Sequence, residues 1–353
     1  MRPSRHATPA DAGNGADGLR AKVSYLSDPA SYPERPTAVE LVQTHMSCVF
    51  LTDRHAWKLK KPVRYPFLDF STREARRTDC EEELRLNRRL AADVYLEVVP
   101  LALAPGGGFA LGGGGEAADW LVKMRRLPRR LMLDQALREG GVERADVTAL
   151  IRALVDFYRG AEPVPIDPAR YRLRFESGIR EGYRELACGG YGLPAQAIAA
   201  AEAGALAALE RETVALERRA RERRIVEGHG DLRPEHVCLG AQPLVIDCLE
   251  FNRDWRVLDP ADELAYLALE CVHAGAAWIG DVALASYREQ AADPVPAGLL
   301  AFYQAYRAGI RARLCAWHLH DHPDPADQGR WIARAQRYLD LAQRRACADP
   351  VRP

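Results

Sequence analysis

The sequence contains the stretch HGDLRPEH at residues 229–236, and VID follows at residues 245–247. Each stretch comes after a short apolar run that predicts a β-strand, so Asp231 lies in a loop behind one strand and Asp247 closes another. Carboxylates at two neighbouring strand ends suit phosphoryl transfer, because one aspartate can orient a hydroxyl nucleophile while the other holds Mg²⁺ on the phosphates. The stretch therefore predicts a phosphoryl-transfer site.

These motifs, in this order, resemble those of the aminoglycoside phosphotransferase-like family, which has the protein-kinase-like fold. The HGD triplet at 229–231 matches that family's catalytic loop, and Ile246-Asp247 matches its metal-binding aspartate. The resemblance runs from about Val39 to the C-terminal helices. It implies an α+β fold of two lobes, a small β-rich N-lobe and a larger, mostly helical C-lobe. It also implies a kinase that phosphorylates an alcohol group of a small molecule.

The hydrophobic pattern divides the chain into three parts. Residues 1–36 are rich in Ala, Gly, Pro, Asp and Ser without a sustained period, which predicts a poorly ordered leader with room for a short helix near Leu19–Leu26. Residues 37–128 are expected to form the N-lobe, with the nucleotide-binding sheet and one helix. Residues 129–353 are expected to form the C-lobe, with the catalytic loop, the metal site and the substrate-binding helices.

Asp231 is the first candidate catalytic residue, as the group that accepts or orients the proton of the substrate hydroxyl. The alternative is a turn aspartate, since Gly-Asp is common turn chemistry. His229 is expected to support the loop backbone through a hydrogen bond. Asp247 is the candidate metal ligand, because Mg²⁺ prefers hard oxygen donors and takes one or two carboxylates. Glu250 either adds a second carboxylate or forms a plain salt bridge.

His236 departs from the family pattern, which has an asparagine ligand for a second metal ion at this position. Imidazole is a poor Mg²⁺ ligand beside oxygen donors. Three explanations stay open: Glu235 takes the asparagine's place, the enzyme uses one metal ion, or catalysis is weak or lost. His236 is kept among the candidate metal residues.

Lys58 and Lys60 lie two residues apart in a predicted strand and therefore point to the same face. The resemblance implies that one lysine binds the α- and β-phosphates of the nucleotide, steadied by a glutamate from the following helix. The spacing to that helix favours Lys58 slightly over Lys60, and the alternative is a solvated basic edge strand. The helix offers glutamates at 81–83, and Glu83 lies nearest to its apolar face.

Two further segments have features that are also found in phosphate-binding loops. Residues 44–47 occupy the place of the phosphate-covering hairpin, where Ser47 and backbone amides would contact phosphate, although a plain β-turn explains them equally well. The glycine runs at 106–108 and 112–115 lack the lysine and helix start of a phosphate-binding loop, so we expect a flexible hairpin loop.

Composition limits the partners of the chain. Its 353 residues hold 49 Lys+Arg and 49 Asp+Glu, so no net charge attracts nucleic acid or a membrane surface. No apolar run approaches the roughly 20 residues that span a bilayer, and no signal peptide is evident. The eight cysteines form no CxxC pair, which indicates reduced thiols in the cytoplasm. We therefore expect no nucleic-acid or membrane partner.

Three functions are compatible with these residues. The first is an Mg²⁺- and ATP-dependent phosphotransferase whose partners are the nucleotide and a small-molecule acceptor. The second is a non-catalytic, pseudokinase-like regulatory module that binds nucleotide, an idea motivated by His236. The third treats His229, Asp231, His236 and Asp247 as a metal-hydrolase cluster, which leaves Lys58 and Glu83 without a role.

Overall fold

The computed structural model describes residues 16–65, 67–321 and 325–348, which form two compact units. The first unit contains the chain up to residue 129 together with residues 245–253, and the second contains residues 130–244 and those from 254 onward. Residues 245–253 were expected in the C-lobe. The structure places them in the first unit, because Asp247 and Glu250 bond to its lysines.

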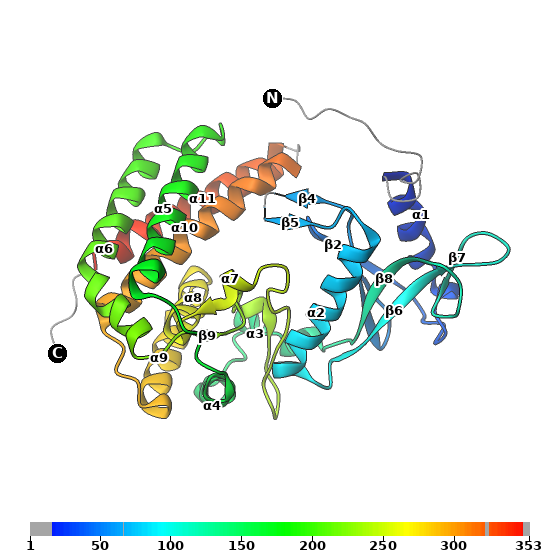
Figure 1. Ribbon diagram of the computed structural model, residues 1–353, viewed down its shortest axis with the longest axis horizontal. Helices are drawn as coiled ribbons and strands as arrows, with labels where there is room; N and C mark the ends of the chain where they lie inside the picture. Colours follow the sequence, from blue (N-terminus) through cyan, green and yellow to red (C-terminus); the bar gives the residue numbers. More distant parts are fainter. Residues whose placement is uncertain (1–15, 66, 322–324, 349–353) are drawn as a thin grey trace. The chain divides into compact units, whose positions relative to one another are not determined.

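A six-stranded antiparallel sheet forms the centre of the first unit, with the order β1-β2-β3-β8-β6-β7. Figure 1 labels β2, β8, β6 and β7 of this sheet. Its strands are β1 (Glu40–Gln43), β2 (Ser47–Leu51), β3 (His55–Lys60), β6 (Tyr95–Leu103), β7 (Phe109–Leu111) and β8 (Ala117–Arg125). Alternation along β3 sends Trp57 and Leu59 into the apolar core on one face, whereas Lys58 and Lys60 point to the other. A short hairpin of β4 (Arg64–Tyr65) and β5 (Leu68–Asp69) follows β3.

Helix α1 (Ala16–Leu26) packs on the apolar face of this sheet, and the short 3-10 helix η2 (Pro29–Ser31) follows it. Leu26 and Tyr32 are 0% and 2% exposed, and Lys22 Nζ lies 2.7 Å from Asp119 Oδ2. The short helix expected near Leu19–Leu26 is present as α1, and the described part of the predicted leader is more ordered than expected. The apolar residues of α1 give a weak signal in so short a helix, and the sheet supplies the burial that stabilises it.

Helix α2 (Arg73–Ala91) lies along the same unit and contacts β6 and β8 (Figure 1). Thr72 caps its N-terminus, because the Thr72 hydroxyl accepts a hydrogen bond from the amide of Ala75. The buried face of α2 carries polar side chains at helical spacing: Arg76, Asp79, Glu83 and Asn87. Buried polar groups require partners, so this face fixes where the neighbouring polar residues must lie.

The second unit is mostly helical (Figure 1). Its helices are α3 (Leu133–Glu139), α4 (Arg144–Gly160), α5 (Pro168–Cys188), α6 (Ala195–Arg221), α7 (Arg253–Arg256), α8 (Pro260–His273), α9 (Ala277–Ala291), α10 (Ala297–Asp321) and α11 (Pro325–Ala346), with 3-10 turns η3 (Arg129–Leu131) and η4 (Pro234–His236). Helices α5, α6, α10 and α11 pack against one another. None of the helices in the described part of the chain has the length and apolar character needed to cross a bilayer.

Short strands interrupt the helices around the predicted site. They are β9 (Val226–Glu227), β10 (Val237–Cys238), β11 (Leu244–Val245) and β12 (Val257–Leu258). The two strands predicted before Asp231 and Asp247 are present as β9 and β11, but they are not neighbours. Strand β9 pairs with β12, and β11 pairs with β10. The prediction of neighbouring strand ends was wrong, because residues 237–238 and 257–258 supply the actual pairing partners.

Buried ion pairs fasten helix α8. Arg219 of α6 donates to both carboxylate oxygens of Asp259 at 2.6 and 2.8 Å, and Asp259 caps α8 by accepting from the amide of Ala261. Arg307 of α10 donates to Asp262 at 2.8 and 2.6 Å. Bidentate pairs of this kind restrict geometry as well as adding energy, so α8 is a rigid support for the loop that precedes it. All eight cysteines are free thiols, and six of them are buried.

Candidate functional site

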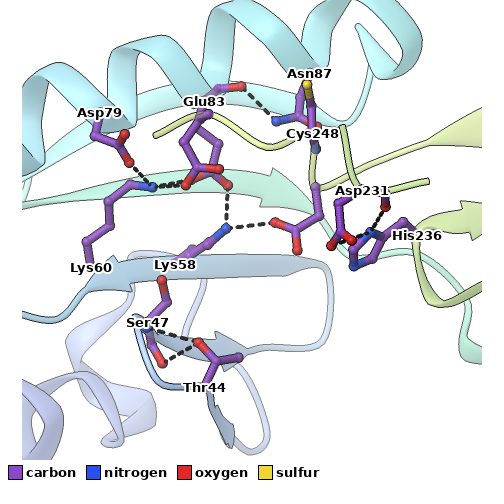
Figure 2. A network of polar contacts seen from close by, with 12 residues as sticks. Thr44, Ser47, Lys58, Lys60, Asp79, Glu83, Asn87, Asp231, His236 and Cys248 are labelled. Carbon is purple, nitrogen blue, oxygen red and sulfur yellow. Dashed lines mark hydrogen bonds and ion pairs between the residues drawn. The ribbon is translucent and has the colours of Figure 1, made fainter. Parts of the chain in front are cut away.

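The two β3 lysines share one glutamate in the first unit (Figure 2). Lys58 Nζ lies 2.9 Å from Glu83 Oε1 and 2.8 Å from Asp247 Oδ1. Lys60 Nζ lies 2.7 Å from Glu83 Oε2 and 2.5 Å from Glu250 Oε1. Among the three adjacent glutamates, Glu83 is the one that reaches the lysines, because the other two pair with Arg77 and Arg85 on the helix surface.

Burial separates the two lysines. The Lys58 side chain is 13% exposed, whereas that of Lys60 is fully buried and also contacts Asp79 at 2.5 Å. Burial by itself would lower the pKa of each lysine, but the carboxylates around it outweigh that effect and hold both pKa values well above the ordinary value. Both lysines are therefore charged at neutral pH. Lys58 is the one whose ammonium group can reach a ligand, and Lys60 holds α2 to residues 245–253.

Asp247 has an unusual backbone conformation, with φ of 60° in the left-handed region. Non-glycine residues in this region store strain of about 1–3 kcal/mol and persist where the surroundings fix them, often at functional sites. Here the amide of Asp247 donates to the Tyr95 hydroxyl at 3.0 Å, and the next amide, of Cys248, donates to Asn87 Oδ1 at 2.8 Å. These bonds fix the direction of a carboxylate that is 44% exposed.

The charged side chains around Lys58 and Lys60 form a cluster with more negative than positive charges, which favours binding of an additional cation. It contains two lysines and four carboxylates, namely Lys58, Lys60, Asp79, Glu83, Asp247 and Glu250. Asp247 is the exposed carboxylate, whereas Glu250 is 9% exposed and bonded to Lys60. Because Mg²⁺ in phosphate sites takes only one or two carboxylates, the donor set around Asp247 fits it. Within the described ranges, no group of three or more His, Cys, Asp or Glu residues is arranged to hold a metal ion.

The backbone of the HGD loop is held by helix α8 in the second unit. Glu263 Oε1 accepts hydrogen bonds from the amides of His229, at 2.7 Å, and Gly230. The Tyr158 hydroxyl donates to the other Glu263 oxygen at 2.7 Å. Gly230 has φ of 88°, a conformation that favours glycine. The His229 ring is buried, and its Nδ1 lies 3.3 Å from the amide of Asp231, so His229 supports the loop backbone.

Asp231 presents a partly exposed carboxylate at the end of this loop. Its side chain is 27% exposed, Arg233 lies 3.0 Å from Oδ2, and the Tyr266 hydroxyl donates to Oδ1 at 3.2 Å. Burial by itself would raise the pKa of Asp231, but the positive charge of Arg233 is the largest effect in the opposite direction, and the pKa is lowered to about 2. Asp231 is therefore ionised at neutral pH, as a group that accepts a proton must be.

This pKa gives a testable pH dependence of stability. The folded-state pKa of about 2 lies below the ordinary value of 3.8, so ionised Asp231 stabilises the fold above about pH 4, and this contribution is lost as the pH falls towards 2. Urea unfolding of the wild type and Asp231→Asn should show a constant difference in unfolding free energy above pH 5 that shrinks between pH 4 and 2. A difference independent of pH throughout would contradict this assignment.

His236 is bonded on both ring nitrogens, and Figure 2 shows its contact with Asp231. Its Nδ1 lies 2.8 Å from the carbonyl oxygen of Asp231, which can only accept, so Nδ1 carries the proton. Its Nε2 lies 3.1 Å from the guanidinium of Arg233, which can only donate, so the lone pair of Nε2 points to Arg233. This arrangement does not offer the imidazole to a metal ion. His236 fastens the loop instead of acting as the predicted ligand.

The predicted phosphate contact of Ser47 does not fit the structure. The amide of Ser47 donates to Thr44 Oγ1 at 3.0 Å, and its carbonyl oxygen accepts from the amide of Thr44 at 2.9 Å (Figure 2). The Ser47 residue is 3% exposed. These bonds close a tight turn between β1 and β2, which corresponds to the plain β-turn alternative.

Arg233 is a charged residue beside Asp231 that was not predicted from the sequence. It lies two residues after Asp231, contacts Asp231, Glu235 and His236, and is mostly buried. Burial by itself would lower its pKa, but Asp231 outweighs this and raises the pKa above the ordinary range. The sequence signal was its place in the stretch itself, because an arginine two residues after an aspartate can pair with it.

Comparison with known proteins shows the fold. No family model matches the sequence. The chain is 31% identical over 320 residues to Uncharacterized protein Rv2004c of Mycobacterium tuberculosis and equally to Uncharacterized protein Mb2027c of Mycobacterium bovis. The alignment covers 86% of this chain but only 60% of those proteins.

One solved structure aligns over 95% of this chain and all of its own, with a TM-score of 0.51 and 12% identity. It is a thermostable mutant of aminoglycoside phosphotransferase APH(4)-Ia in a ternary complex with AMP-PNP and hygromycin B. The chain has the fold of that phosphotransferase. This result confirms the predicted two-lobed, protein-kinase-like architecture, with a β-rich first unit and a mostly helical second unit.

Proposed function

We propose that this protein is an Mg²⁺- and ATP-dependent phosphotransferase that acts on a hydroxyl group of a small molecule. The observation that carries this proposal is the arrangement of Lys58, Glu83 and Asp247, in which a charged lysine is bonded both to a fully buried glutamate and to an exposed carboxylate. The phosphotransferase of the same fold binds an ATP analogue and a small-molecule acceptor together, which supports both halves of the proposal.

Each residue has a distinct role in this proposal. Lys58 binds the α- and β-phosphates, and Glu83 keeps its ammonium group in place. Asp247, with Glu250 behind it, holds Mg²⁺, which neutralises charge on the phosphates. Asp231 accepts or orients the proton of the acceptor hydroxyl, and its low pKa keeps it ionised for this task.

Mg²⁺-dependent nucleotide binding tests the first half of the site. Calorimetric titration of ATP into the wild type should show binding that strengthens when Mg²⁺ is added, because Asp247 contributes a ligand to the metal ion. In Asp247→Ala this gain should disappear. Glu81→Gln, which changes an exposed carboxylate of α2, is the matched control and should bind like the wild type. Mg²⁺-dependent binding that survives in Asp247→Ala would contradict the proposed metal role.

A second candidate function is a non-catalytic module that binds nucleotide. It is favoured by one observation, the commitment of both nitrogens of His236 to the loop, at a position where the family has a metal-binding asparagine. This candidate predicts ATP binding without transfer. ADP release that depends on any member of an acceptor panel would rule it out.

A further inference from the structure

Positively charged side chains extend from Asp231 across the second unit. Arg233 contacts Asp231, and Arg311 of α10 lies against the ring of Tyr338, 5.4 Å from its centroid. Arg334 of α11 lies 6.0 Å from the centroid of the same ring and 5.7 Å from that of Trp331. Together with the exposed Arg337, these residues form what we call the arginine surface: Arg233, Arg311, Arg334 and Arg337.

The carboxylates beside this surface are already bonded within the protein. Glu235 lies 3.3 Å from Arg233. Glu270 accepts from Arg311 at 3.1 Å and from the Tyr338 hydroxyl at 2.8 Å. Glu263 accepts from the loop amides and from Tyr158. A polycationic acceptor would have to displace these internal donors, and breaking a buried, hydrogen-bonded charge pair is costly.

Two arginines of this surface have unused donors. The Nε atoms of Arg233 and Arg334 are buried and make no hydrogen bond within the part of the chain that the structure describes. A buried donor on a charged group requires an acceptor, and the planar guanidinium matches carboxylate and phosphate oxygens in particular. An anionic ligand is therefore the partner that suits these two side chains, and it would meet them through their exposed parts, since the Arg233 side chain is 18% exposed and Arg334 is half-exposed.

The low pKa of the neighbouring His273 is consistent with an excess of positive charge at the arginine surface. The ring of His273 stacks on Tyr338 with a centroid distance of 4.3 Å. The pKa of His273 is lowered to about 4, mainly by burial and then by the positive charges of Arg334, Arg337 and Arg311. Glu235 has the opposite effect, but it is smaller. His273 is thus neutral at physiological pH and adds no charge of its own.

We propose that the acceptor is a hydroxyl compound that carries carboxylate or phosphate groups, and that the arginine surface binds those groups. This inference rests on the proposed function and assigns the substrate class of the same enzyme. It predicts that polyamine-like molecules such as aminoglycosides are poor acceptors, because the arginines repel them.

The test is calorimetric titration at constant ionic strength with citrate, glycerol 2-phosphate and spermidine as carboxylate, phosphate and cationic probes. The wild type should bind at least one of the two anions and bind spermidine more weakly. Arg334→Glu reverses one charge of the surface at a half-exposed position, so it should fold normally and weaken anion binding by about tenfold or more. Arg184→Glu, which reverses an exposed charge on α5, is the matched control and should bind anions like the wild type.

Two results would overturn the inference: tighter binding of spermidine than of both anions, or anion binding that is unchanged in Arg334→Glu. Citrate and glycerol 2-phosphate separate the two sources of negative charge, since the probe that binds more tightly identifies the acceptor's anionic group.

Titration of Mg²⁺-ATP into the same wild-type sample distinguishes failure of the anion-site proposal from failure of the phosphotransferase proposal. Anion binding that depends on Arg334, without Mg²⁺-ATP binding, would support the arginine surface as an anion site and contradict the phosphotransferase.

Discussion

Replacement of Asp231 by asparagine is expected to lower the rate of phosphoryl transfer by roughly 10²–10⁴-fold, the range that a positioned general base contributes. Asparagine keeps the size of the side chain but cannot take the proton of the acceptor hydroxyl. Binding of Mg²⁺-ATP should be unchanged, because the proposed nucleotide ligands Lys58 and Asp247 belong to the other unit. Acceptor-dependent ADP release and calorimetric titration of ATP measure the two quantities separately.

The matched control for this variant is Asp156→Asn, which changes a largely exposed aspartate on α4 that pairs only loosely with Arg159 at 3.9 Å. Its transfer rate should equal that of the wild type. Thermal unfolding of both variants shows whether the loop has kept its fold after the Arg233 pair is lost. Undiminished turnover in a folded Asp231→Asn protein would remove Asp231 from the catalytic role.

The two β3 lysines should give opposite results when each is replaced by methionine. Lys60→Met leaves Asp79, Glu83 and Glu250 without their shared cation, and loss of one partner from a buried ion pair costs about 3–5 kcal/mol. Lys58→Met should be tolerated better, because Asp247 is 44% exposed and Glu83 keeps its bond to Lys60. Its main effect should be the loss of Mg²⁺-ATP binding.

Each variant is the control for the other, since both remove one positive charge from the same face of one strand. Denaturant unfolding reports the change in stability, and calorimetric titration of ATP reports the change in binding. A Lys60→Met protein of native stability that fails to bind ATP, together with a Lys58→Met protein that binds it, would reverse the assignment of the phosphate lysine.

Parts of the candidate site follow from local sequence alone. The glycine in HGD, the apolar residues before it and the aspartate after Ile246 predict a loop and a strand end, because turns and short strands depend on neighbouring residues. Helical spacing also singled out Glu83, since Leu86 and Leu90 lie three and seven residues further on the same face. The structure shows that Glu83 is the glutamate that contacts both lysines.

Other parts depend on residues that are distant in the chain. The pairing of β9 with β12, and of β10 with β11, was mispredicted because partner choice between short strands is decided by tertiary contacts. The sequence allowed for a short helix near Leu19–Leu26, but not for its burial, since the apolar residues of α1 are covered by the sheet. His236 was expected near a metal ion, and only the positions of Arg233 and the Asp231 carbonyl showed its bonding.

The sequence by itself determined the identities and local settings of Asp231, Asp247 and Glu83, and the common face of Lys58 and Lys60. Periodicity and turn chemistry act over a few residues and can be read along the chain. Only the tertiary structure decided which lysine is less buried, how His236 is bonded and that Arg233 and Arg311 pair with Asp231 and Glu270. Burial and charge pairing depend on residues brought together from distant segments, and these determine which groups remain available to a ligand.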